Sequence, residues 1–209
     1  MADPVPAPGE ALNDGEPTVP RLAATVILLR GGAHDLEVLL VRRTPRARFM
    51  AGAWVFPGGA VDPGDGEGQA GLRAAGAREL AEEAGIDLGP DAELVAFSNW
   101  ITPARVRTRY DTWFYLATMP EGQEPRVDGD EIVDARWLRP ANALATAERG
   151  DFLIVFPTAK QLERLADVGS ADALLALARG RTVEPVEPHV VGSGEQARIV
   201  LPGEPGYAD

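Results

Sequence analysis

Three glutamates stand close together in the segment RELAEEAGI, residues 78–86, at positions 79, 82 and 83. If this segment is helical, the spacings of three and four residues place all three carboxylates on one face, where like charges repel. A fold gains nothing from that repulsion, but hard divalent cations such as Mg²⁺ bind carboxylates together with water and phosphate oxygens. We therefore interpret Glu79, Glu82 and Glu83 as a metal platform for phosphate chemistry. The alternative is a solvated acidic helix face.

The residues around these glutamates have types that suit such a platform. Arg78 could hold a glutamate by a two-pronged contact and so fix its rotamer. Upstream, Phe56-Pro57-Gly58-Gly59 contains glycines that let the backbone approach the helix closely, and the Gly59 carbonyl (or that of Gly58) could serve as a further metal ligand. Ions held there would lower the pKa of an attacking water and neutralise charge on a leaving phosphate. The expected catalytic residues are thus Arg78, Glu82 and Glu83.

The general base can be assigned in two ways. It could be a glutamate of the helix itself, or a carboxylate on a later loop. The acidic stretch Asp128-Gly129-Asp130-Glu131 precedes an expected strand at residue 135. We choose Glu131 as the base and interpret Asp128 and Asp130 as residues of a solvated turn.

The elements that must position these residues follow from hydrophobic patterning. Strands are expected at 23–29, 37–43, 54–56, 94–100, 110–117 and 135–138, and helices at 70–84, 140–148, 158–168 and 172–179. Gly85 is expected to end the glutamate helix. Strands that alternate with helices favour an α/β fold with a mixed sheet between helices.

Three regions are expected along the 209 residues. Residues 1–20 are rich in Pro, Gly and acids and predict a disordered or loosely attached arm. Residues 21–170 form the main domain. Residues 171–209 form a C-terminal extension with a short helix, and its segment 197–202 could be an edge strand.

Composition excludes several classes of function. The chain has no cysteine, only two histidines and a formal net charge of −12. Thiolate chemistry is therefore excluded, a histidine-based zinc site is improbable, and nucleic acid is not an expected partner. No apolar run is long enough to cross a bilayer, and the N-terminus lacks the features of a signal peptide, so we expect no membrane partner and a cytoplasmic location.

The motif as a whole resembles that of the Nudix hydrolases. The family pattern is Gly, five residues, Glu, seven residues, then Arg-Glu-apolar-x-Glu-Glu-x-Gly-apolar, and its second half matches completely at residues 78–86. In the first half Gly59 matches, but Asp65 replaces Glu and twelve residues separate it from Arg78. We expect the extra residues, within 66–71, to lengthen the loop before the helix. The resemblance implies a Nudix-type α/β/α sandwich, Mg²⁺ or Mn²⁺ as cofactor, and cleavage of a nucleoside diphosphate linked to another moiety.

The wider sequence resembles the Nudix subgroup that includes the peroxisomal acyl-CoA diphosphatases. The similar segments are 48–62, 100–103, 109–114 and 137–140. This implies CoA or acyl-CoA as the favoured substrate. Arginines would meet its phosphates and apolar residues its pantetheine or acyl arm; the expected contact residues are Arg46, Arg48, Phe49, Trp100 and Arg109.

Other functions stay open at this stage. ADP-ribose or NADH could be the substrate instead, and a Nudix-like sensor that binds such a compound without cleaving it is a further alternative, although sensors usually lose box glutamates. A homodimer is possible, as in resembling enzymes.

Overall fold

The computed structural model describes residues 12–13, 15–192 and 197–207. Within them a mixed sheet runs in the order β3-β2-β1-β6-β5-β8, with β4 also paired to β1 and β7 to β2. Its strands are β1 (Arg21–Arg30), β2 (Glu37–Arg43), β3 (Trp54–Val55), β4 (Gly58–Ala60), β5 (Val95–Ile101), β6 (Tyr110–Thr118), β7 (Ile132–Leu138) and β8 (Pro185–Val186). The helices are α1 (Gly68–Ala84), α2 (Pro140–Glu148), α3 (Phe156–Leu165) and α4 (Ala171–Ala178).

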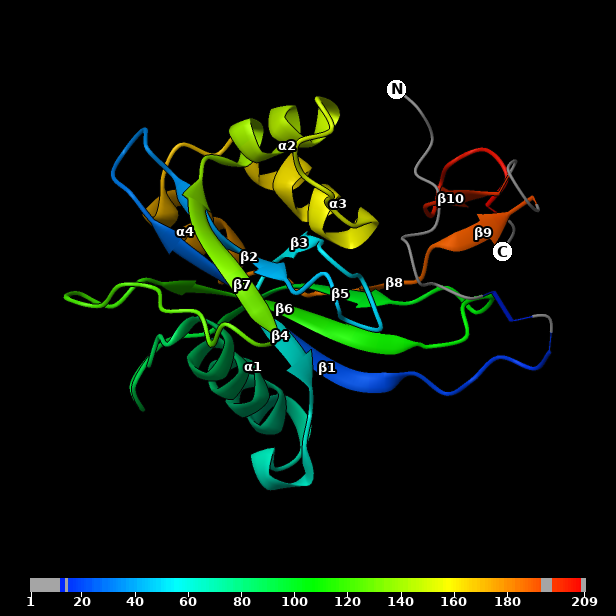
Figure 1. The fold of residues 1–209 in the computed structure, drawn as a ribbon, viewed down its shortest axis with the longest axis horizontal. Coiled ribbons are helices and arrows are strands. Elements are labelled where there is room, and N and C mark those ends of the chain that lie inside the picture. The colour runs from blue at the N-terminus through cyan, green and yellow to red at the C-terminus, as the bar shows by residue number, and fades with distance from the viewer. Residues whose placement is uncertain (1–11, 14, 193–196, 208–209) are drawn as a thin grey trace.

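Helices cover both faces of this sheet, with α1 on one side and α2 and α3 on the other (Figure 1). Alternate residues of β1 pack against the helices on the two faces. Ile27 and Leu29 pack in the cluster that includes residues of α2, α3 and α4. Val26 and Leu28 pack in the cluster that includes Leu80 of α1. A strand buried on both faces needs a continuous apolar run, which residues 26–29 supply. The predicted α/β/α sandwich is confirmed.

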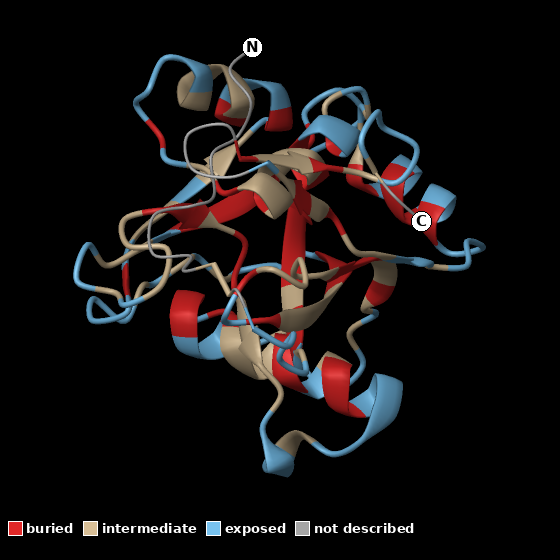
Figure 2. Cartoon of the chain, turned by 90° about the vertical axis from the view of Figure 1, so that its right-hand side faces the viewer, coloured by how far each residue is buried: buried red, intermediate tan, exposed pale blue. Residues whose placement is uncertain are grey.

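One edge of β1 is shared by two different strands. At its end β1 pairs with β2 through Leu29 and Arg30, and near its start it pairs with β4 through residues 23–25. The strands β2 and β4 therefore diverge from each other along β1. Figure 2 shows the buried residues concentrated in the central strands, while the outer faces of the helices are exposed.

Helix α1 begins earlier than the sequence pattern suggested. The extra residues of the motif were expected to lengthen the preceding loop, but residues 68–71 form the first turn of α1 instead. A short 3₁₀ helix, Pro63–Asp65, precedes it. Gly71 allows this arrangement, because a Cβ there would lie 2.4 Å from the carbonyl oxygen of Gly66. Gly85 ends α1 in the left-handed conformation, as predicted (φ 66°).

The C-terminal residues form a separate hairpin. Strands β9 (His189–Val191) and β10 (Arg198–Val200) pair antiparallel in a two-stranded sheet of their own. The segment 197–202 was expected as an edge strand, but the edge of the main sheet is taken by β8, which pairs with β5. The hairpin lies beside the start of the main strands (Figure 1). No helix in the described part of the chain has both the length and the apolar character that a membrane span requires.

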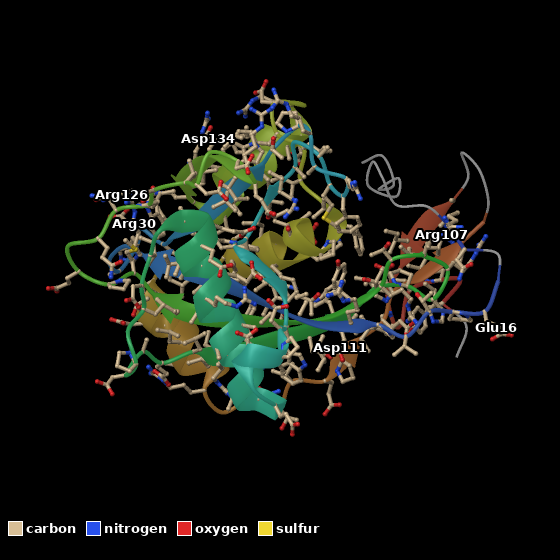
Figure 3. All side chains as sticks on the ribbon, turned by 60° about the horizontal axis from the view of Figure 1, so that its bottom comes forward. Glu16, Arg30, Arg107, Asp111, Arg126 and Asp134 are labelled. Carbon is tan, nitrogen blue, oxygen red and sulfur yellow. The ribbon has the colours of Figure 1, made fainter. Side chains whose placement is uncertain are left out.

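Part of the predicted N-terminal arm also has fixed contacts. Leu12 forms a β-bridge with Val106, the Asn13 amide donates to the Arg105 carbonyl, and the Thr18 hydroxyl donates to the Arg107 carbonyl. Arg107 itself lies at the hairpin end of the molecule (Figure 3). Residues 1–11 of the arm fall outside the described residues.

Candidate active site

A cavity of about 390 Å³ opens where β2 and β4 diverge. Its charged lining consists of Arg43, Glu79, Glu83 and Glu131, and its glycine lining of Gly58 and Gly59. The rest of the wall is mostly apolar or aromatic and includes Phe49, Met50, Trp100, Val106, Phe114, Phe156, Val190 and Ile199. The volume falls within the range of small-molecule sites.

Two of the predicted helix glutamates face this cavity. The Glu83 side chain is only 5% exposed, and its Oε2 accepts a hydrogen bond of 3.0 Å from the Gly58 amide. The Glu79 carboxylate lies directly over Gly59, where an added Cβ would be 2.4 Å from Oε1. A side chain at Gly59 would therefore displace the Glu79 carboxylate, whereas a Cβ at Gly58 would lie 2.5 Å from the Ala24 carbonyl oxygen on β1.

Arg78 holds the carboxylates in place from the side. Its Nη1 donates to Oε1 of Glu79 (2.8 Å) and to Oε2 of Glu82 (3.1 Å). Its two-pronged contact was expected with a glutamate, but Asp65 is the partner: Nε and Nη2 each donate at 3.0 Å to one of the two Asp65 oxygens. Nη2 also donates to the Ala60 carbonyl on β4. Arg78 thus ties α1 to the segment that precedes it.

Asp65 is thus the ion-pair partner of Arg78. Its side chain is 7% exposed, and Oδ2 also accepts from the Asp62 amide at 2.8 Å. The Arg78 guanidinium holds the pKa of the Asp65 carboxyl below its usual range. The pKa of Arg78 is raised in turn, chiefly by its hydrogen bonds to Asp65. An ionised pair with this geometry fixes the rotamer of Arg78.

The cavity glutamates have the opposite electrostatic balance. Burial raises the pKa of Glu83 to about 7, against the Gly58 hydrogen bond and Arg43, and the charges of Glu79 and Glu131 add to the rise. Burial also raises the pKa of Glu79, against the contact with Arg78, and the Glu82 and Glu131 charges again contribute. Carboxylates that repel one another in a partly buried site are a common sign of function.

These observations fit a divalent cation. Among the described residues, no three carboxylates converge on one point as they stand, since Glu79 and Glu82 are held by Arg78. Mg²⁺ needs only one or two carboxylates when water and substrate phosphates complete its shell. Glu79, Glu83 and the Gly59 backbone can provide such ligands at the cavity wall. A cation there would favour the charged forms of the two glutamates, whose pKa values are raised chiefly by burial and further by neighbouring carboxylates.

The structure distinguishes Glu82 from the other two helix glutamates. Its side chain is 59% exposed, and it does not belong to the cavity lining. It lies one helical turn after Arg78, with which it forms a salt bridge of 3.1 Å.

Glu131 is brought to the same cavity by the turn that precedes β7. The Asp128 carboxylate accepts from the backbone amides of Asp130 (2.8 Å) and Ile132 (2.9 Å), which closes the turn. The Glu131 carbonyl accepts from the Thr44 amide at 2.7 Å, which links the turn to the loop after β2. Its charge acts on both Glu79 and Glu83.

The predicted substrate-contact residues divide into two groups. Phe49 and Trp100 line the cavity. Arg46 and Arg48 are exposed on the loop after β2 and do not line it. Arg109 is also outside the lining: its guanidinium is buried and donates to the Thr102 carbonyl, the Thr18 carbonyl and the Glu187 carboxylate. With Nε, Nη1 and Nη2 all engaged, Arg109 joins three segments of the protein instead of lining the cavity.

Sequence reasoning did not assign several residues that the cavity contains. Arg43, at the end of β2, places Nη1 3.8 Å from Oε1 of Glu83. The first turn of α3 contributes Phe156 and Thr158, and the C-terminal hairpin contributes Val190 and Ile199. Arg43 could have been suspected from its place after an apolar strand. The hairpin residues give no comparable signal, because they are ordinary apolar residues far from the motif.

Comparison with known proteins agrees with this fold and site. The NUDIX domain profile matches residues 19–155, more than half of the chain. The chain therefore belongs to the NUDIX family. It is a hydrolase of the kind that cleaves diphosphates, and enzymes of this family generally use divalent cations.

The chain is also similar to individual relatives and solved structures. The human protein named acyl-coenzyme A diphosphatase NUDT19 is 27% identical over 206 residues, which cover 94% of this chain and 54% of that protein. A Caenorhabditis elegans relative that carries the name nudix hydrolase 7 is 27% identical over 90% of this chain and 75% of its own length. Among solved structures, a NUDIX hydrolase from Alicyclobacillus acidocaldarius superimposes with a TM-score of 0.68 at 28% identity, covering 78% of this chain and 99% of that one.

Proposed function

We propose that the protein hydrolyses the diphosphate of coenzyme A and its acyl thioesters, with Mg²⁺ or Mn²⁺ as cofactor. One observation carries the proposal: the same cavity is lined by the carboxylates of Glu79, Glu83 and Glu131 and, over most of the rest of its wall, by apolar and aromatic residues. Coenzyme A thioesters pair a diphosphate with a long, weakly polar arm, so the two kinds of lining match the two parts of the substrate. The likeness to the human acyl-CoA diphosphatase supports the same class, although the match spans only about half of that relative.

In the proposed reaction, water attacks one phosphorus and the bond from that phosphorus to the bridging oxygen breaks. The products are two phosphate monoesters. Divalent cations held by Glu79, Glu83 and the Gly59 carbonyl, with Glu82 as a further ligand from outside the cavity lining, would neutralise charge on the phosphates and acidify the water. Glu131 would accept the proton from the water, since its turn brings it to the same cavity as Glu79 and Glu83.

Other side chains would bind and position the substrate. Arg78 holds Glu79 and Glu82 and so fixes where ligands can form. Arg43 would contact the diphosphate, because it lines the cavity beside Glu83. Phe49 and Trp100 would contact the weakly polar arm. Arg46 and Arg48 would meet the 3′-phosphate where it leaves the cavity.

The proposal is tested by steady-state hydrolysis of CoA, acyl-CoAs, ADP-ribose and NADH with Mg²⁺ or Mn²⁺, with products identified by mass spectrometry in ¹⁸O-labelled water. We expect the highest kcat/KM with a CoA compound and ¹⁸O in one of the two monoesters. A kcat/KM at least tenfold higher for ADP-ribose or NADH would overturn the substrate assignment. Dephospho-CoA tests Arg46 and Arg48, whose loss should matter only when the 3′-phosphate is present.

A further inference from the structure

The C-terminal hairpin forms one wall of the active-site cavity. Val190 of β9 and Ile199 of β10 lie directly opposite each other in the hairpin register, and both line the cavity. Pro188, just before β9, lines it as well. All three lie outside residues 19–155, where the family profile matches. This wall is thus an addition of this chain to the part that carries the catalytic motif.

The wall is anchored to the main domain. Val190 packs in a small apolar cluster with Val106, Leu12 and Ile199. Nη1 of Arg105 donates to the carbonyls of Val190 (3.3 Å) and Gly192 (2.9 Å). The salt bridge of 2.6 Å between Arg109 and Glu187 fixes the segment that enters the hairpin. These contacts hold Val190 and Ile199 at a defined place beside the cavity.

The charged and the hairpin residues of the cavity lining come from different elements. Its charged lining residues, Arg43, Glu79, Glu83 and Glu131, come from β2, from α1 and from the turn before β7, whereas the hairpin segment contributes only Pro188, Val190 and Ile199. A phosphate or ribose placed against that wall would lose hydration without gaining hydrogen bonds from these side chains. An alkyl chain would instead gain by leaving water.

We infer that Val190 and Ile199 form a subsite for the acyl chain of the substrate and that they determine which chain lengths are accepted. This rests on the proposed function, because it assigns the acyl group of the same thioesters to one wall of the same cavity. Each methylene that enters such a subsite should raise kcat/KM by about fourfold until the space is filled.

The test is the dependence of kcat/KM on acyl length, from CoA and acetyl-CoA to palmitoyl-CoA, in wild type and variants. Ile199→Phe narrows the subsite, and we expect the ratio of kcat/KM for octanoyl-CoA to that for CoA to fall by about tenfold. Ile199→Ala and Val190→Ala widen it, so the optimum should move to longer chains. Val191→Phe is the matched control: Val191 follows Val190 on the same strand and so points to the other face, and it does not line the cavity.

The outcomes separate this inference from the proposed function. If the wild type cleaves CoA compounds but the length profile is unchanged in Ile199→Phe, Ile199→Ala and Val190→Ala, with melting temperatures preserved, only the subsite is wrong. If Val191→Phe changed the acyl-length profile as much as Ile199→Phe does, the subsite would also be wrong, because the effect would then be a general structural one. If the wild type cleaves no CoA compound, the proposed function and the subsite both fail. Should Ile199→Phe not fold, the two alanine variants decide the question.

Discussion

The charged side of the cavity and its hairpin wall are built in different ways. On the charged side, Gly58, Gly59, Arg78, Glu79 and Glu83 lie within one stretch of 26 residues, and Arg43 and Glu131 join them from outside it. The hairpin wall, with Val190 and Ile199, packs against Leu12 and Val106, which are far from it in the sequence. Chemistry that depends on helix spacing can be encoded locally, whereas a surface that selects a substrate arm can be assembled from any segments that meet. Changes on the charged side should therefore reduce turnover of every substrate, and changes at the wall should alter substrate choice.

The largest effect is expected for Glu83→Gln. The side chain keeps its size and can still accept from the Gly58 amide, but it loses the charge that a divalent cation needs. We expect kcat to fall by about 10³-fold or more for all substrates, with the fold intact. Glu93→Gln is the matched control, because Glu93 is an exposed carboxylate that pairs with Arg179 on the surface. Wild-type turnover in Glu83→Gln would exclude the metal-platform account.

The second prediction concerns stability and pH in metal-free protein. The pKa of folded Glu83 is raised to about 7 from an ordinary value of 4.5, chiefly by burial. A raised pKa means that this group stabilises the fold fully below pH 4.5 and that the contribution is lost as pH rises through 7. The loss corresponds to about 3 kcal/mol. The difference in free energy of unfolding between wild type and Glu83→Gln, measured by urea denaturation from pH 4.5 to 8, should therefore change by about this amount.

A divalent cation should reverse that loss at pH 8 in the wild type but not in Glu83→Gln. A constant difference between the two proteins across the pH range would show that Glu83 titrates normally. Burial of Glu83 would then make no pH-dependent contribution to the free energy of unfolding.

The third prediction concerns Arg78, which positions the glutamates that we propose as metal ligands. Arg78→Ala frees Glu79 and Glu82 and leaves Asp65 without its partner. Loss of such supporting contacts typically lowers activity or metal affinity by about 10- to 100-fold. We expect kcat to fall by an amount on this order. The Mg²⁺ concentration at half-maximal activity should rise as well. Arg136→Ala, which removes an exposed salt bridge with Asp134, is the control. An unchanged Mg²⁺ dependence would mean that Arg78 has only a structural role.

The smallest effect is expected at the anchor of the wall. Glu187→Gln weakens the contact with Arg109, and at a partly exposed site we expect a loss of about 1 kcal/mol in stability. KM for long acyl-CoAs should rise several-fold, while kcat for CoA changes little. A matching fall in kcat for every substrate would contradict the division between the two sides of the cavity.

This division also explains what the sequence could predict. The pattern Arg-Glu-x-x-Glu-Glu-x-Gly correctly predicted helix α1 and its end at Gly85, because these depend on neighbours in the chain. The apolar run at residues 23–29 likewise predicted a strand, which the structure buries on both faces. The extra residues before Arg78 were expected in a loop, but they extend the helix because Gly71 lets the chain return close to Gly66.

Contacts between distant segments could not be predicted. Arg109 was expected to meet substrate because arginines suit phosphates, but Thr18 and Glu187, which are remote in the sequence, occupy its guanidinium. The residues near Arg109 in the sequence do not predict those partners. For the same reason the position of Val190 and Ile199 at the cavity could not be predicted.

The contacts of Arg109 also set an order of events during synthesis. Thr18 precedes Arg109 by 91 residues, and Glu187 follows it by 78. As the chain leaves the ribosome, the charged side can assemble once residue 131 has emerged. The hairpin wall must wait for residues up to 200, and long loops must close before its contacts form. A nascent chain would therefore carry the proposed metal ligands well before the proposed acyl-chain subsite.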